Sequence, residues 1–300
     1  MFKQWLKWAA IGWIILSLQG CEQGSAQQPY QPTAAPHHKE HYIVGIHPYL
    51  NSQKLYAAYA PILTYLEQQI PNVEFSLETS SDYASYEQKL RRGQFHFALP
   101  NPYQTIESLS SGYRVTARMA PDSVFKGLII ARKDSQIKQH EQLKQRSIAF
   151  TAKTALAATM MPKYYLYMNG VNVDKEMQPR YVTSQFSAIM NVYNKDTFVA
   201  ATWPVAYKAW QREFPEAANE LETLWETPSL VNNAWIARKD VPTSVTDSVT
   251  ALLVHLSDTE QGKALLAPTS SDGFIAASDA DCCWLCTRFI EYRLYSARVS

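Results

Sequence analysis

The sequence has almost no net charge and few glycines, and both shortages narrow the functions open to it. Its 300 residues carry 28 Lys and Arg against 27 Asp and Glu, a formal net charge of +1. Such a balance gives no composition-level case for binding nucleic acid or an anionic membrane surface. Ten glycines argue against loops that wrap closely around the phosphates of a nucleotide. No Gly-x-Ser-x-Gly elbow, His-Glu-x-x-His pair, Gly-rich phosphate loop or paired Cys-x-x-Cys motif occurs. We therefore expect neither an enzyme nor a cofactor or metal site.

Cysteine is also scarce, and the first of the four stands in a targeting segment. Two lysines precede an apolar run over residues 8–18, a pattern typical of a secretory signal and too short for a confident membrane-spanning helix. The run closes on Leu18-Gln19-Gly20-Cys21, which resembles the bacterial lipobox. The resemblance implies that residues 1–20 are a signal peptide and that Cys21 is lipidated. The alternative is an uncleaved anchor helix with an incidental cysteine.

Lipidation at Cys21 would place the protein in the cell envelope, anchored by its acyl chains and facing the periplasm. Glu22 follows, where Asp is the usual inner-membrane retention signal, so the outer membrane is slightly favoured in a Gram-negative host. Residues 21–41 are rich in Gln, Pro, Ala and His and read as a flexible tether. The tether holds His37, His38 and His41, which could bind zinc in a metal chaperone but more simply form a solvated linker.

The other three cysteines, Cys282, Cys283 and Cys286, lie in the C-terminal tail. Three is an odd number for an oxidising compartment. Cys283 and Cys286 have redox-motif spacing, but they do not follow a strand and open a helix as in a thioredoxin-like unit. We interpret them as structural or incidental.

From residue 42 onward, short β-rich runs alternate with amphipathic helical segments. Strands are expected at residues 42–46, 73–77, 95–99, 113–119, 127–131, 147–150, 180–183 and 198–202. Helices are expected through Leu55, Tyr59 and Leu66, over 82–92 with Asp82 as N-cap, and over about 154–168. This alternation predicts two α/β lobes with mainly parallel sheets and ligand-binding loops at the carboxyl ends of the strands.

Several segments, taken in order, resemble the phosphate/phosphite/phosphonate substrate-binding family of ABC importers. They are Ala58 to Leu66, Asp82-Tyr83, Gly93, Pro100-Asn101-Pro102-Tyr103, Ile148-Ala149-Phe150, Pro162 to Gly170, and Ala234 to Pro242. The similarity covers about residues 42–278. It implies a bilobal periplasmic-binding fold, with residues 42–128 plus 235–300 in the first lobe and 129–234 in the second. It also implies a small oxyanion ligand held by hydroxyls and by N–H groups at a helix start.

Six residues are the candidate ligand-binding set. Tyr83 and Tyr103 match family positions at the cleft, and core packing is the alternative for both. Tyr49 follows the first strand, Thr154 is either an anion donor or a simple N-cap, and Gln185 stands where the family commonly has His. Trp203 follows a strand and could line the pocket or the core.

The departures from the family pattern concern this same site. The family's Ser-Thr-Ser-Gly run is replaced by Thr154-Ala155-Leu156-Ala157, and Thr197 stands for an Asp near the following strand. Fewer hydroxyls predict weaker anion binding or a larger ligand. Two functions follow: a lipid-anchored, monomeric receptor that delivers a small oxyanion to an ABC permease, or an envelope lipoprotein of the same fold with an altered pocket that reports to a membrane sensor kinase.

Overall fold

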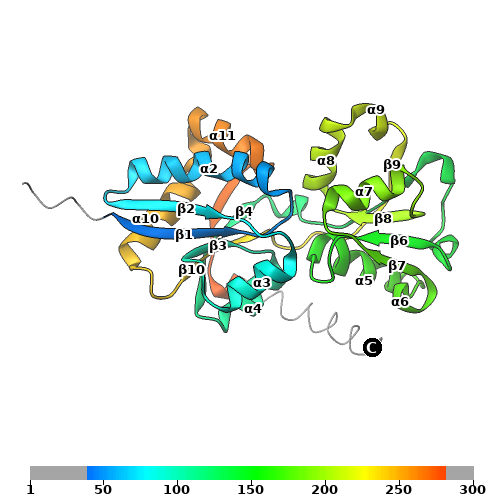
Figure 1. Cartoon of the computed structure of the whole chain (residues 1–300), viewed down its shortest axis with the longest axis horizontal. Helices are drawn as coiled ribbons and strands as arrows, with labels where there is room; N and C mark the ends of the chain where they lie inside the picture. Colours follow the sequence, from blue (N-terminus) through cyan, green and yellow to red (C-terminus); the bar gives the residue numbers. More distant parts are fainter. Residues whose placement is uncertain (1–38, 282–300) are drawn as a thin grey trace, which may run out of the picture. The chain divides into compact units, whose positions relative to one another are not determined.

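Two β-sheets organise residues 39–281, the part of the chain that the computed structural model describes (Figure 1). The first sheet has the strand order β11-β4-β10-β3-β1-β2 and the second β7-β6-β8-β5-β9. The first contains β1 Glu40–Ile46, β2 Val73–Glu78, β3 Phe97–Leu99, β4 Tyr113–Ala120, β10 Ala234–Arg238 and β11 Gly273–Ala276. The second contains β5 Leu128–Arg132, β6 Ser147–Phe150, β7 Gln178–Tyr181, β8 Val199–Thr202 and β9 Leu221–Glu226.

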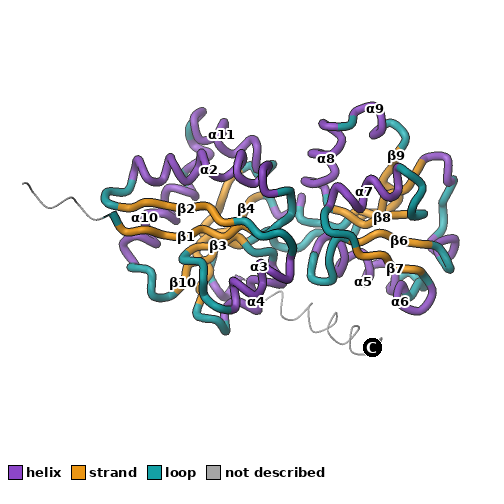
Figure 2. Tube along the Cα trace, viewed as in Figure 1, coloured by secondary structure: helices purple, strands orange, loops and turns teal. Residues whose placement is uncertain are grey.

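Helices cover both faces of each sheet (Figure 2). Those of the first sheet are α2 Ser52–Gln69, α3 Tyr83–Arg91, α4 Pro102–Leu109, α10 Thr243–Val254 and α11 Glu260–Leu266. Those of the second are the π-helix Leu156–Met160, which continues into α5 Met161–Met168, then α6 Val173–Glu176, α7 Gln185–Tyr193, α8 Pro204–Glu213 and α9 Pro215–Ala218. The chain passes between the sheets through residues 121–127 and 227–233.

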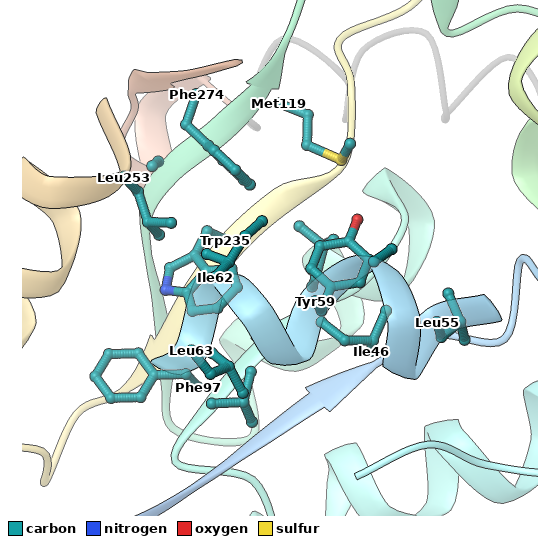
Figure 3. Close-up of a cluster of buried hydrophobic side chains, with 14 of the residues drawn as sticks. Ile46, Leu55, Tyr59, Ile62, Leu63, Phe97, Met119, Trp235, Leu253 and Phe274 are labelled. Atoms are coloured by element: carbon teal, nitrogen blue, oxygen red, sulfur yellow. The ribbon is translucent and has the colours of Figure 1, made fainter. Parts of the chain in front are cut away.

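The core of the first sheet explains why α2 forms where it does. Its apolar side chains recur at helical spacing, so Tyr59, Ile62 and Leu63 all point at the sheet and are buried. They pack with Phe97 of β3 and Trp235 of β10 (Figure 3). The Asn51 side chain caps the helix by accepting a hydrogen bond from the Lys54 N–H at 2.9 Å. The opposite face of the sheet is covered by α3 and α4.

The prediction of mainly parallel sheets is wrong. β1 pairs with β2 and β3 in parallel, and β6 with β7 and β8, as strand-helix-strand units require. The other pairs are antiparallel, because the strands that arrive from the crossing segments run the opposite way: β10 inserts between β3 and β4, and β5 lies between β8 and β9. The alternation of strands and helices in the sequence predicts strand-helix-strand units, but it does not show where in the sheet a strand that returns from the other sheet inserts.

Most of the expected elements are present, but helices α4, α7 and α8 were not expected from the sequence. The expected helix over 154–168 starts as a π-helix at Leu156, with Ala155 as its N-cap rather than Thr154. Strands β9 and β11 were not expected from the sequence. The predicted Asp82 cap is confirmed, since its side chain accepts a hydrogen bond from the Ser85 N–H at 2.8 Å. Within residues 39–281, no helix combines the length and apolarity needed to cross a membrane.

Candidate functional site

A cavity lies where the carboxyl ends of six parallel strands, three from each sheet, lead into loops and helix starts. The lining residues are His47, Tyr49, Tyr83, Asn101, Phe125, Ala155, Leu156, Ala157, Ala158, Gln185 and Trp203. The space between the atoms is about 220 Å³, its open mouth included. Because this figure includes solvent at the mouth, the enclosed part of the cavity is smaller still and suits only a small molecule.

Five helix starts meet at this cavity, those of α3, α4, α7, α8 and the π-helix, and they differ in how their ends are capped. The side chains of Asp82, Asn101 and Ser184 cap α3, α4 and α7. The π-helix that leads into α5 has no side-chain cap, because its N-cap residue is Ala155. The first N–H groups of a helix have no partner within the helix. In the described chain, the N–H groups of residues 156–158 donate no hydrogen bond, so this helix start presents free donors and a partial positive charge.

Gly127 allows this uncapped helix start to lie close to the beginning of β5. A Cβ atom on Gly127 would stand 2.6 Å from the Ala157 carbonyl oxygen and 2.7 Å from Cγ of Pro162. Real Cβ atoms do not approach other atoms so closely. The Gly127 backbone is held in place by Thr227, whose hydroxyl accepts its N–H at 2.9 Å. The position of the free donors therefore depends on the absence of a side chain at residue 127.

Asn101 joins the two sheets across the cavity. Its Oδ1 caps α4 by accepting the Gln104 N–H at 3.0 Å, and Gln104 Oε1 accepts the Asn101 N–H at 3.0 Å in return. The remaining Asn101 amide donates to the Thr154 carbonyl oxygen at 3.1 Å. The Asn101 side chain thus ties the start of α4 to the turn before the π-helix.

Tyr83 belongs to a second chain of hydrogen bonds that crosses between the sheets. The Thr202 hydroxyl donates to Gln185 Oε1 at 3.0 Å, and the Gln185 side chain also bonds the Tyr83 hydroxyl. Burial raises the pKa of Tyr83 above its ordinary value, so the phenol stays protonated. Gln185 lowers the pKa of Tyr83, which is the effect of an amide N–H that donates to the phenol oxygen, so the phenol proton remains available to an acceptor.

Tyr49 and Trp203 form an aromatic wall of the cavity. The two rings meet edge to face at 5.4 Å, and the Tyr49 hydroxyl bonds that of Tyr59 at 2.8 Å. Burial raises the pKa of Tyr49 above its ordinary value, which keeps it neutral. The Trp203 indole N–H is buried and has no hydrogen-bond partner among residues 39–281. An unpaired buried donor costs free energy, and an acceptor within reach of this N–H would remove that cost.

His47 follows β1 and is the one ionisable nitrogen among the lining residues. Its Nδ1 lies 2.7 Å from the Leu99 carbonyl oxygen. Burial lowers the pKa of His47 to about 4, against the smaller raising effect of that hydrogen bond. The ring is therefore neutral at pH 7. None of the lining residues is Asp, Glu, Lys or Arg, so the cavity attracts an anion through neutral donors and helix dipoles.

The structure brings together four of the six predicted ligand residues. Tyr49, Tyr83, Gln185 and Trp203 line the cavity. Tyr103 is on α4 and packs at the edge of the first core, and Thr154 contributes its carbonyl oxygen to Asn101. Neither of these two is among the lining residues.

Four lining residues were missed by the sequence interpretation: His47, Asn101, Phe125 and Ala158. Signals were present for two of them. His47 directly follows the first strand of a parallel unit, and Asn101-Pro102 is a typical helix start. Thr197, which was compared with a family Asp, lies before β8 at the opposite edge of its sheet. Trp203 is the residue that follows this strand at the cavity.

The predictions for Cys21, its tether as far as His38, and Cys282, Cys283 and Cys286 lie outside the described residues. His41 is described and stands in β1. No group of three or more His, Cys, Asp or Glu side chains suited to a metal ion is found within residues 39–281.

Comparison with known proteins agrees with a binding cavity of this kind. Residues 44–282 match the family described as "ABC transporter, phosphonate, periplasmic substrate-binding protein". The chain belongs to this family. It is 22% identical over 275 residues to the phosphonates-binding periplasmic protein of Escherichia coli K12, covering 89% of this chain and 81% of the relative.

Solved structures establish the fold of this family for the chain. A binding protein component of an ABC phosphonate transporter from Pseudomonas aeruginosa matches with a TM-score of 0.77 at 20% identity, covering 87% of this chain and 88% of that one. PhnD1 from Prochlorococcus marinus, in complex with methylphosphonate, matches with a TM-score of 0.76 at 18% identity, covering 84% and 99%. The chain is therefore a bilobal periplasmic substrate-binding component of an ABC transporter and not an enzyme.

Proposed function

We propose that the cavity binds a small oxyanion of the phosphate, phosphite or phosphonate type and that the protein delivers it to an ABC permease. The observation that carries the proposal is the uncapped helix start at residues 156–158, with three free N–H groups at a cavity that has no charged side chain. The free donors of Tyr83 and Trp203 support it, and so does the methylphosphonate bound to a relative of the same fold.

The expected loss of donors at this helix is smaller than the sequence suggests. The family's hydroxyl run is replaced by alanines here, but backbone N–H groups do not depend on the side chain that follows them. Ala155 also leaves the helix without a cap of its own, so the N–H groups stay free for a ligand. We propose that backbone donors supply most of the anion's hydrogen bonds in this protein.

The two halves of the molecule and its attachment are part of the proposal. We propose residues 42–128 with 235–300 as the first lobe and 129–234 as the second, because the strands of the two sheets separate along the chain in this way. The protein acts as a monomer held in the envelope, on the outer membrane in a Gram-negative host, by lipid on Cys21. Labelled palmitate on the wild type but not on Cys21→Ser tests the lipid attachment.

Titration calorimetry of methylphosphonate, phosphite and phosphate against wild type and Ala155→Asp tests the ligand class. An Asp at this N-cap accepts the free N–H groups and places a negative charge at the cavity. We expect at least one of the three anions to bind the wild type and to lose about 100-fold in affinity, roughly 2.7 kcal/mol, in the variant.

Two controls make this titration specific. Ala155→Asn caps the helix without a charge, so its loss should be smaller than that of Ala155→Asp. Arg146→Gln removes a charge at the opposite edge of the second sheet and should bind like the wild type. A wild type that binds none of the anions, or an Ala155→Asp variant with unchanged affinity, would contradict the proposal.

A further inference from the structure

His47 presents an acceptor to a cavity whose other free polar groups are donors. A carbonyl oxygen only accepts hydrogen bonds, so the 2.7 Å contact with Leu99 places the proton of the neutral ring on Nδ1. Nε2 then carries a lone pair. It makes no hydrogen bond to any residue of the described chain, and His47 is only 2% exposed while it lines the cavity.

The groups packed against His47 do not stabilise a charge on it. The rings of Tyr49, Tyr83 and Tyr86 lie 5.0, 6.0 and 6.2 Å from the imidazole. Burial raises the pKa of each of these tyrosines, so all three are neutral. Glu87 acts on Tyr83 and Tyr86 but not on His47, and it accepts the Gln104 side-chain amide at 3.1 Å. No carboxylate acts on the ring among residues 39–281.

We infer that His47 selects ligands that are protonated. The site binds an oxyanion that carries one hydroxyl group, and Nε2 of His47 accepts a hydrogen bond from that hydroxyl. This inference rests on the proposed function, and it divides the oxyanions into two classes. Phosphite and phosphonates have their second ionisation near neutral pH, as phosphate groups do, so a hydroxyl form is available. A sulfonate at the same pH offers only lone pairs, and one of its oxygens would face the lone pair of Nε2.

The same site can accept a sulfonate only by protonating His47 first. The ring would then donate from Nε2, but its proton must come from solution against the cost of charging a buried imidazole. Binding of a sulfonate therefore takes up one proton, and its affinity should rise by up to about tenfold for each pH unit of acidification. Binding of a phosphonate monoanion takes up none over the range in which that form predominates.

The test is calorimetric titration of wild type with methylphosphonate and methanesulfonate, two ligands matched in size and methyl group, at pH 5, 6 and 7. We expect methylphosphonate to be preferred by about 100-fold at pH 7, because a site built around a hydroxyl rejects an analogue that lacks it. The preference should shrink as the pH falls, through tighter sulfonate binding. Equal affinities at pH 7, or a preference that does not change with pH, would overturn the inference.

Two variants separate selection from a purely structural role of His47. His47→Asn retains a donor for the Leu99 carbonyl but has no atom at the Nε2 position, and we expect the preference to fall below about fivefold. His47→Gln places an amide near Nε2 that can turn its NH₂ group to the ligand, and it should restore sulfonate binding. Equal weakening of both ligands in the two variants would show a structural role only. A wild type that binds neither ligand would overturn the proposed function along with this inference.

Discussion

The second sheet has a cavity at each end of its parallel strands, and the two cavities differ in the polar groups that line them. The cavity at the carboxyl ends of its parallel strands is narrow, about 220 Å³, and is lined by neutral groups with unused donors. The one at the amino ends of β6, β7 and β8 is wider, about 930 Å³ with its open mouth, and is lined by charged side chains. Only the first has the features of a ligand site.

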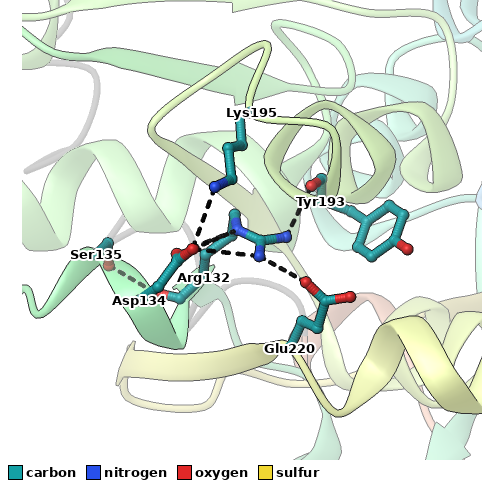
Figure 4. A network of polar contacts seen from close by, with 6 residues as sticks. All are labelled: Arg132, Asp134, Ser135, Tyr193, Lys195 and Glu220. Atoms are coloured by element: carbon teal, nitrogen blue, oxygen red, sulfur yellow. Dashed lines mark hydrogen bonds and ion pairs between the residues drawn. The ribbon is translucent and has the colours of Figure 1, made fainter.

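Three of the four charged side chains that line the second cavity, Arg132, Asp134 and Lys195, are joined in one network, and the fourth, Arg146, lies over the Phe198 ring. Arg132 donates to Glu220 at 2.5 Å, to Asp134 at 3.1 Å and to the Tyr193 carbonyl oxygen at 2.9 Å (Figure 4). Lys195 lies 3.2 Å from the same Asp134. Hydrogen bonds from Arg132, and then from Lys195, hold the pKa of Asp134 below its usual range. A count of charged residues would favour this cavity, whereas the free backbone N–H groups at residues 156–158 favour the other.

The largest expected effect is a pH dependence of stability that comes from the neutral, buried His47. Its pKa is about 4 in the folded protein against 6.5 for an ordinary histidine, so the unfolded chain takes up the proton first as the pH falls. Stability from this group is complete above pH 6.5 and decreases between pH 6.5 and 4, by about 3 kcal/mol in all. Urea unfolding over this range should show a steeper pH dependence in the wild type than in His47→Asn. Parallel curves would contradict the neutral, buried imidazole.

Gly127→Ala should displace the helix start that lines the narrow cavity. The new Cβ collides with the Ala157 carbonyl, so we expect a stability loss of about 2 kcal/mol and an affinity loss of about tenfold for the bound oxyanion. Gly112→Ala is the matched control, because Gly112 has a φ of 86° but open space around its Cβ position. It should lower stability without changing affinity. Equal affinity losses in the two variants would argue against a specific role of Gly127.

Lys54 offers a smaller test, since it links α2 to helices of the second sheet. Its ammonium pairs with Glu213 and stands 3.9 Å from the ring centroid of Phe186. Lys54→Met keeps the stem but loses the charge, and we expect an affinity loss of at most about threefold because the pair is partly exposed. High salt should reduce the difference between wild type and variant. A loss larger than tenfold would mean that this contact, rather than the cavity, controls binding.

The smallest effect on binding is expected in the charged cavity. Arg132→Gln removes the centre of the network in Figure 4 and should lower the Tm by no more than about 3 °C. Affinity for the oxyanion should stay within twofold of wild type. A clear loss of affinity would show that ligand binding in the narrow cavity depends on the charged network at the opposite edge of the sheet.

The elements that position the site could be predicted from local patterns. Asp82 was recognised as a cap because Asp stands before an amphipathic segment, whereas Tyr83 was expected from the resemblance to the family. Tyr49 and Trp203 were placed at strand ends by the alternation of strands and helices alone. These signals are local, since a cap or a strand end involves only a few neighbouring residues.

The remaining features depend on contacts that the sequence does not display. The insertion of β10 between β3 and β4 joins segments more than a hundred residues apart. The N-cap of the π-helix is Ala155, one residue after the expected Thr154, and Thr154 instead accepts a hydrogen bond from Asn101 at its carbonyl oxygen. His47 becomes an acceptor only because the Leu99 carbonyl lies within 2.7 Å of its Nδ1.

The proposed function requires that free backbone N–H groups at residues 156–158 hold the oxyanion. Amide chemical shifts in an ¹⁵N-labelled sample, followed by NMR during a phosphite titration, test it most directly. The account predicts that the amide protons of Leu156, Ala157 and Ala158 move furthest downfield, while those of Arg146 and Thr197 at the opposite edge stay unchanged. Saturating phosphite binding with the largest shifts at the opposite edge, or with unmoved amides at residues 156–158, would contradict it.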